Sequence, residues 1–253
     1  MRIQLLRNAT LLLNYAGKKI IIDPNFAGKH TMPSYTGSSL NPLVDLPCNP
    51  LNIIKDLDFT IISHLHTDHF DCIAQNLLPK NLPILCQSED TYEIRSNGFQ
   101  NVLPIIDYIV WEEIEITRII CQHGSGKVLQ EMGTASGFIF KNKHEPSIYW
   151  AGDTVWNNII KETIVKVKPN IIVTHSCGAV WGDGVLIVMD AKQTVSVCLA
   201  APTSTVIATH MDSFDHATVS RVNLRKFAEA NNISTKQLLI PLDGEFYNFY
   251  LSK

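Results

Sequence analysis

The alternation of apolar and polar residues predicts short strands interleaved with helices along the whole chain. Runs rich in Ile, Val and Leu, bounded by Gly, Pro or Asn turns, are typical of strands. They cover residues 3–6, 10–15, 18–22, 58–62, 83–86, 101–103, 108–111, 114–121, 136–141, 148–151, 171–174, 205–209, 238–240 and 246–251. Helical spacing with capping and stop residues predicts helices over 72–78, 88–97, 156–167, 191–201 and 217–231. Because no linker, repeat or low-complexity segment interrupts this order, we expect one α/β domain over residues 1–253, with helices covering buried sheets.

Residues 25–52 depart from this pattern. The segment contains four prolines and shows little periodicity. A loop of this length in a compact domain is usually functional or mobile. If it lies over a cleft, His30 or Tyr35 can touch a substrate, and a plain surface excursion is the alternative for either residue.

The strand over 58–62 runs into a histidine-rich stretch, Ser63-His64-Leu65-His66-Thr67-Asp68-His69-Phe70-Asp71. In an extended segment alternate side chains point the same way, so His64 and His66 can reach one ion together. Asp68 and His69, beyond the bend, can reach a neighbouring ion. Imidazole nitrogen and carboxylate oxygen suit zinc, manganese or iron. The alternative is a polar loop that contains histidines by chance, but composition gives this pattern only about 0.0006 times per chain, which favours a metal site.

The motif His-Leu-His-Thr-Asp-His resembles the signature of the metallo-β-lactamase superfamily. The resemblance implies a four-layered αβ/βα sandwich and three further ligands, each at the end of a strand. The sequence offers them in the expected order, as His123 in Gln-His-Gly, Asp153 in Ala-Gly-Asp-Thr and His210 in Ala-Thr-His-Met-Asp.

The resemblance also implies how the ligands divide between two divalent cations, with zinc expected first and manganese or iron as alternatives. The first cation would be held by His64, His66 and His123. The second would be held by Asp68, His69 and His210, with Asp153 bridging the two.

The reaction class that the resemblance implies is metal-assisted hydrolysis of an ester, lactone, amide or phosphoester. Two cations can share one water, lower its pKa toward neutrality and polarise the bond under attack. Asp68 is the expected catalytic residue, because a carboxylate there can accept the nucleophile's proton or pass one to the leaving group. Oxygen-reducing di-iron members of the superfamily typically have Glu where His66 stands, so the chain resembles the hydrolases.

Two further residues are candidates for supporting roles. Asp23 ends the strand over 18–22 in an Asp-Pro pair, where it can accept the N–H of a ligand histidine, or simply form a turn. His175 follows the strand over 171–174, where it can bind substrate, act as an acid, or be a hydrogen-bonded structural histidine. His216 is expected to open the last long helix, and Asp183 to lie in a solvated turn.

Composition narrows the classes of partner. A hydrophobic content of 45% and a charged content of 18% describe an ordinary soluble globular protein. The net charge is −3 and the Lys and Arg residues are scattered, so nucleic acid is not an expected partner. The six cysteines form no C-x-x-C pair and no secretion signal is recognisable, so we expect reduced thiols. No apolar run approaches the ~18 residues of a membrane span. We therefore expect a cytoplasmic protein that acts on a small molecule, and homo-oligomerisation stays open.

The leading hypothesis is a metal-dependent hydrolase that uses a metal-bridged hydroxide on a small cytosolic ester, lactone or phosphorylated metabolite. The overall size, the early Ile-Asp-Pro and the stretch Met189-Asp190-Ala191 resemble the group of ascorbate-6-phosphate lactonase. One alternative is a phosphodiesterase of the same fold. Another is a non-catalytic metal-binding sensor or interaction domain, which the seven filled ligand positions disfavour.

Overall fold

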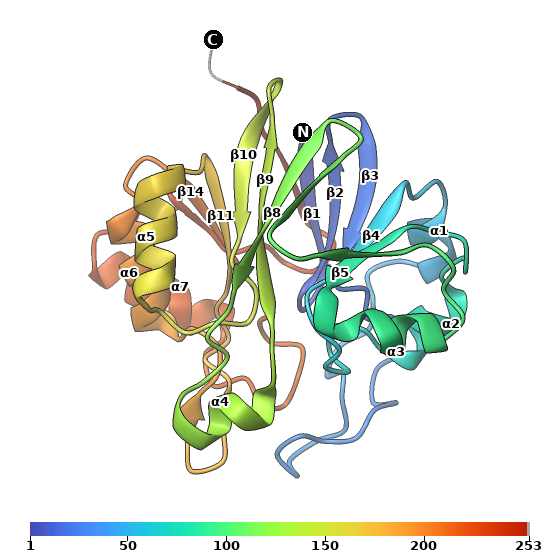
Figure 1. Cartoon of the computed structure of the whole chain (residues 1–253). Helices are drawn as coiled ribbons and strands as arrows, with labels where there is room; N and C mark the ends of the chain where they lie inside the picture. Colours follow the sequence, from blue (N-terminus) through green and yellow to red (C-terminus); the bar gives the residue numbers. More distant parts are fainter. Residues whose placement is uncertain (252–253) are drawn as a thin grey trace.

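Two seven-stranded sheets form the centre of the computed structural model, which describes residues 1–251 (Figure 1). The strands of the first sheet are β1 Arg2–Arg7, β2 Thr10–Tyr15, β3 Lys18–Ile22, β4 Phe59–Ile62, β5 Ile84–Gln87, β6 Val102–Ile105 and β16 Phe246–Asn248. The strands of the second sheet are β7 Tyr108–Trp111, β8 Ile114–Ile120, β9 Ser136–Asn142, β10 Glu145–Trp150, β11 Ile171–His175, β14 Thr205–Thr209 and β15 Leu238–Leu239. Their spatial orders are β16-β1-β2-β3-β4-β5-β6 and β15-β14-β11-β10-β9-β8-β7. A separate two-stranded hairpin pairs β12 Val180–Trp181 with β13 Val185–Leu186.

Helices cover the outer faces of both sheets, as Figure 1 shows. The helices beside the first sheet are α1 Pro50–Ile54, α2 Cys72–Leu77 and α3 Thr91–Ser96, the last preceded by a 3-10 turn at Ser88–Asp90. Those beside the second are α5 Asn158–Val167, α6 Ala191–Ala200 and α7 Arg221–Ala230, and α4 Gly126–Met132 lies apart, near the lower ends of the strands. Within residues 1–251, none of the helices has the length and hydropathy to span a lipid bilayer.

Three hydrophobic clusters account for the layers. One cluster contains residues of both sheets, such as Ile20, Phe59 and Trp150, and fills the space between them. A second lies under α1–α3 and a third under α5–α7. Apolar residues on both faces of each sheet explain why the strands read as nearly continuous hydrophobic runs. The expected four-layered αβ/βα sandwich is confirmed.

Parallel pairing brings the functional strand ends to one edge. β3 and β4 are parallel, and so are β10, β11 and β14. Because β9 is antiparallel to both β8 and β10, β8 also runs in the direction of β10. Residues that follow these strands therefore meet at the same edge of the sandwich, the lower edge in Figure 1.

The structure corrects several predicted boundaries. The last helix begins at Arg221 after the N-cap Ser220, whose side chain accepts the N–H of Asn223, so His216 lies in the preceding loop and does not open the helix. The helix predicted over 88–97 begins with the 3-10 turn at Ser88–Asp90, and the regular helix α3 follows it. The helix predicted over 191–201 corresponds to α6, whose N-cap is Asp190. Both α4 and the hairpin β12–β13 lie in glycine-containing segments where no element was predicted.

Candidate metal centre

The seven residues predicted as metal ligands lie together at the edge where the parallel strands end. They follow four strands, and all of them except His66 are buried. The set consists of His64, His66, Asp68 and His69 after β4, His123 after β8, Asp153 after β10 and His210 after β14. Residues up to 146 positions apart, from His64 to His210, thus converge at the edge where their strands end.

The first group is formed by three histidines, His64, His66 and His123. One ring nitrogen from each lies within 4.8 Å of the others. The Nδ1 atom of His66 is 3.4 Å from Nε2 of His123. This spacing leaves room for a cation between the three nitrogens, and the donor set suits zinc, manganese or iron.

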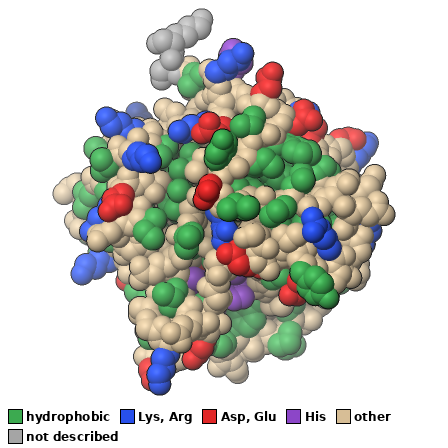
Figure 2. All heavy atoms as spheres, viewed as in Figure 1, with side chains coloured by type: hydrophobic (Ala, Val, Ile, Leu, Met, Phe, Trp, Pro, Cys, Tyr) green, Lys and Arg blue, Asp and Glu red, His purple; other side chains and the backbone are tan. Residues whose placement is uncertain are grey.

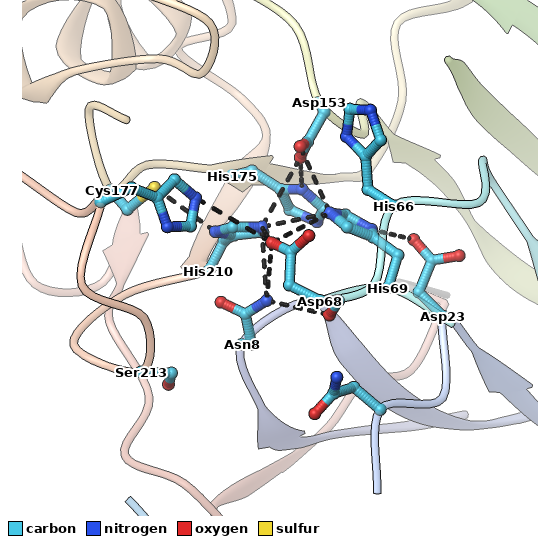
Figure 3. A network of polar contacts seen from close by, with 12 residues as sticks. Asn8, Asp23, His66, Asp68, His69, Asp153, His175, Cys177, His210 and Ser213 are labelled. Carbon is cyan, nitrogen blue, oxygen red and sulfur yellow. Dashed lines mark hydrogen bonds and ion pairs between the residues drawn. The ribbon is translucent and has the colours of Figure 1, made fainter. Parts of the chain in front are cut away.

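The second group consists of Asp68, His69 and His210 and lies beside the first. Figure 3 shows the Asp68 carboxylate pointing toward the two imidazoles. The Oδ2 atom of Asp68 is 3.1 Å from Nε2 of His210 and 3.7 Å from Nε2 of His69. The two imidazole Nε2 atoms are 3.2 Å apart. Asp68 Oδ2 and the two Nε2 atoms therefore form a second cluster of potential ligand atoms.

Asp153 touches both groups. Its Oδ2 atom is 3.2 Å from Nε2 of His69, 3.5 Å from Nε2 of His123 and 3.9 Å from Nε2 of His64. The preceding Gly152 has φ +68°, and a Cβ there would lie 2.7 Å from the carbonyl oxygen of Ser136. Glycine is therefore the residue that lets the chain turn from β10 and deliver this carboxylate between the groups.

Outer hydrogen bonds turn the ligand nitrogens inward. The Nδ1 atom of His69 lies 2.7 Å from Asp23 Oδ2. The Nδ1 atom of His123 lies 2.8 Å from the carbonyl oxygen of Ile187. Both acceptors require a proton on Nδ1, so Nε2 is the nitrogen that each ring turns toward the centre. The Nε2 atom of His64 is buried and has no hydrogen-bond partner within residues 1–251. An orphaned nitrogen among inward-facing imidazoles fits a metal ion.

Asp23 lies where the sequence placed it, after β3, and it is completely buried. Its carboxylate accepts hydrogen bonds from the backbone N–H of Ser63 at 2.7 Å and from the Ser63 hydroxyl at 2.6 Å. The Ser63 hydroxyl oxygen in turn lies 2.9 Å from Nδ1 of His64. Asp23 thus orients two histidines of the motif, His69 directly and His64 through Ser63.

Charge and burial set the protonation states of the imidazoles and carboxylates. Burial lowers the pKa of both His64 and His66, which keeps them neutral. Burial alone would raise the pKa of Asp153, but His69, His210 and the other nearby histidines lower it, so this carboxylate is ionised. Burial alone would also lower the pKa of His69, whereas the surrounding carboxylates raise it to about 10. A cation that binds here must therefore displace a proton from His69.

His175 does not line the cavity over the cluster. Its Nδ1 atom is 2.5 Å from Oδ1 of Asp153, and its ring meets the edge of Trp150 at 4.9 Å. Burial lowers the pKa of His175 to about 4, so the ring is neutral and donates its Nδ1 proton to Asp153. This geometry fits a hydrogen-bonded histidine that orients the Asp153 carboxylate.

Three residues beside the centre were not predicted. Asn8 Nδ2 lies 3.2 Å from the carbonyl oxygen of Asp68 and 3.3 Å from Nε2 of His210, and Cys177 Sγ lies 3.3 Å from the other nitrogen of that ring. His216 Nε2 lies 3.9 Å from Asp68 Oδ2. Asn8 has φ +55° in the turn between β1 and β2, a conformation that asparagine tolerates, and an Asn at that turn was the only sequence signal.

The loop over 25–49 reaches the centre through Tyr35. Asp215 holds this loop in place by hydrogen bonds. Its carboxylate accepts the backbone N–H of Tyr35 at 3.0 Å and the side-chain amide N–H of Asn41 at 2.8 Å. The Tyr35 hydroxyl lies 2.6 Å from Oγ1 of Thr67, and its ring meets the edge of His216 at 5.2 Å. Tyr35 is thus the loop residue placed to meet a substrate. His30, the other candidate, is exposed and does not line the cavity.

A cavity of about 360 Å³ opens over the cluster. It is lined by Tyr35, Leu65, His66, Thr67, Asp68, His123, Glu131, Met132, Asp153, Trp181, Ile187 and His216. Figure 2 shows histidine side chains at the surface in the lower half of the view. A larger and more open depression of about 710 Å³ beside Lys141 and Glu145 has no histidine in its lining, so the smaller cavity is the one joined to the candidate chemistry.

Comparison with known proteins identifies relatives over nearly the full length. The family model for the beta-lactamase superfamily domain matches residues 18–211. The chain is 38% identical to UPF0173 protein YddR of Bacillus subtilis (strain 168) over 98% of this chain and 100% of that protein.

Two solved structures are also similar. An isothiocyanate hydrolase from Delia radicum gut bacteria has 35% identity and a TM-score of 0.92, with 99% of each chain covered. A protein from Veillonella parvula DSM 2008, described as a "possible metal-dependent hydrolase", has 32% identity and a TM-score of 0.94, with 98% of this chain and 99% of that chain covered.

Proposed function

Because the chain belongs to the β-lactamase superfamily, we propose that it is a metal-dependent hydrolase of a small molecule. The observation that carries this proposal is the position of Asp153, whose Oδ2 atom lies 3.2–3.9 Å from histidine nitrogens of both groups. A carboxylate in that position is what a pair of neighbouring cations requires. The related proteins named as hydrolases support the same reaction class.

We assign the two cation positions as the sequence predicted them, with zinc first and manganese or iron as alternatives. His64, His66 and His123 form one position, Asp68, His69 and His210 form the other, and Asp153 belongs to both. When bound, divalent cations at these positions supply an acidified water and polarise the bond that it attacks.

The chain's own residues then handle protons and orientation. Asp68 is ionised, because the histidines around it lower its pKa against the effect of burial, so its carboxylate can accept a proton from water and return it to the leaving group. Burial raises the pKa of Tyr35, so its hydroxyl stays protonated and can donate a hydrogen bond to the substrate atom that gains negative charge. Both residues line the cavity.

For the substrate we favour an electrophilic carbon over a phosphodiester. Hydrolysis of an ester or lactone adds the water oxygen to the carbonyl carbon, breaks the carbon–oxygen single bond and returns a proton to the alkoxide. Isothiocyanate hydrolysis is the second candidate, favoured by the 35% identity over 99% of the chain to a protein with that name. A phosphodiesterase and a non-catalytic metal-binding domain are the remaining alternatives.

The experiment begins with metal analysis of protein purified without chelator or histidine tag. The purified protein is then assayed with a lactone panel, an alkyl isothiocyanate and bis-p-nitrophenyl phosphate. We expect bound divalent metal, turnover of a carbon-centred substrate, and loss of both after chelation or in His66→Ala. The matched control is His144→Ala, an exposed histidine away from the cluster, which should keep metal and activity. Turnover of the phosphodiester alone would select the phosphodiesterase, and metal without any turnover would select the binding domain.

A further inference from the structure

The cavity over the metal centre has one apolar wall. Leu65, Met132, Trp181 and Ile187 contribute to it, and they come from three separate parts of the chain: the motif loop, the end of α4 and the segment around β12–β13. In Figure 1, α4 and this segment lie on the same side below the sheets. The other lining residues are polar: Tyr35, Thr67, His216, Glu131 and the candidate ligands. A molecule in this cavity therefore meets hydrocarbon as well as polar atoms.

The cavity also lacks a protein cation. Within residues 1–251, no Lys or Arg contributes to its lining. The charged groups that line it are Asp68 and Asp153 on the floor and the exposed Glu131 beside Met132. A phosphate or carboxylate on the far end of a substrate would lose water without gaining an ion pair, and it would face Glu131.

Trp181 is the largest apolar side chain of this wall, and the fold leaves it 38% exposed. It sits at the end of β12, immediately before a turn that contains Gly182 and Gly184 with φ of +55° and +80°. An indole held open to solvent at the mouth of a cavity offers a large, rigid surface to an apolar ligand. The size of the cavity, about 360 Å³, corresponds to roughly a dozen water volumes, which suits a small molecule and not a chain end of a polymer.

We propose that the substrate is an uncharged small molecule whose alkyl or aryl group packs against Trp181 and Met132 while its reacting carbon lies over Asp153. This inference rests on the proposed function and narrows it. It removes phosphorylated metabolites from the substrates that the sequence suggested, because their phosphate would lie against the apolar wall and Glu131.

The test uses p-nitrophenyl esters with the metal-loaded protein. Each turnover joins a water oxygen to the acyl carbon, breaks the bond to p-nitrophenolate and releases the acid. The series acetate, propionate, butyrate and pentanoate varies the apolar group, and mono-p-nitrophenyl glutarate matches pentanoate in length but ends in a carboxylate. Each methylene buried should raise kcat/KM by about two- to fourfold. We expect pentanoate to exceed glutarate by at least tenfold.

Two variants locate the effect. Trp181→Ala should flatten the chain-length series mainly by raising KM for pentanoate, with acetate changed less than threefold. Met132→Lys should shift preference toward the glutarate ester. Tyr92→Ala, an exposed aromatic on α3, is the matched control and should leave the series unchanged.

The outcomes separate this inference from the proposed function. Equal kcat/KM along the series, or a preference of the wild-type protein for glutarate, would overturn the inference while the hydrolase stands. A series unaffected by Trp181→Ala would overturn the assigned wall. If the metal-loaded protein hydrolysed none of the esters and none of the substrates of the first panel, the proposed function would fail, and this inference with it.

Discussion

Asp23→Asn is the sharpest test of how the metal centre is built. The wild-type carboxylate accepts three hydrogen bonds, from the backbone N–H of Ser63, from the Ser63 hydroxyl and from Nδ1 of His69. An amide of the same shape keeps one acceptor oxygen and replaces the other with an NH₂ donor. Whichever way the amide turns, at least one buried donor then faces another donor.

The size of the effect on stability and on metal affinity depends on whether the amide nitrogen faces Ser63 or His69. A buried donor left without an acceptor costs about 1–3 kcal/mol of unfolding free energy. If the amide nitrogen faces His69, the ring proton moves to Nε2, and the lone pair aimed at the centre is lost. Loss of such a supporting partner typically lowers metal affinity by about 10- to 100-fold, which is about 1.4–2.7 kcal/mol.

The assay is a competition titration of zinc against a chromophoric chelator, combined with urea unfolding of the same samples. Asp71→Asn is the matched control, because Asp71 is also buried but accepts both of its backbone hydrogen bonds with Oδ1 and leaves Oδ2 without a partner within residues 1–251. The asparagine amide can keep its oxygen at the position of Oδ1 and still accept both bonds, so the affinity for zinc should change less than threefold. Wild-type zinc affinity in Asp23→Asn, together with reduced stability, would refute the orienting role and leave Asp23 as a structural residue.

Three further predictions address the substrate side, the backbone and pH. Tyr35→Phe should lower kcat by about 10-fold or more with little change in KM, since a donor to developing charge is removed, while Tyr92→Phe, 84% exposed, should be neutral in the same steady-state assay. Gly152→Ala should cost more in urea unfolding than Gly17→Ala: both have positive φ, worth about 1–2 kcal/mol, but only at Gly152 does a Cβ meet backbone at 2.7 Å, whereas at Gly17 it meets nothing within 4 Å, so equal losses would argue against that contact. Burial raises the pKa of Asp90 to about 6 from the usual 3.8, so the stability that its neutral form contributes is complete below pH 3.8 and is lost as pH rises through 6. Asp90→Asn should therefore gain stability relative to wild type as the pH rises from 3.8 to about 6, and a constant difference in urea midpoints over that range would contradict this.

Much of the fold and the candidate ligands could be predicted from the sequence. The Ile- and Val-rich runs marked the strands because strand formation depends on neighbours a few positions apart. The motif after β4 and the order of His123, Asp153 and His210 predicted the family, which the family model and the relatives confirm. The narrower resemblance to lactonases stays a prediction, and so do the number and identity of the metal ions.

The tertiary structure alone decided what surrounds those ligands. The sequence predicted that His216 opens a helix, yet His216 lines the cavity. The loop that contains it packs against Cys177, whose carbonyl oxygen accepts the N–H groups of Thr218 and Val219. Tyr35 reaches the centre through bonds to Asp215, a residue 180 positions away. No local pattern encodes such contacts, since they depend on how two sheets pack and which loops then share an edge. The sequence thus determined the strands and the ligand set, while the walls of the cavity, and with them the choice of substrate, exist only once the sheets have packed together.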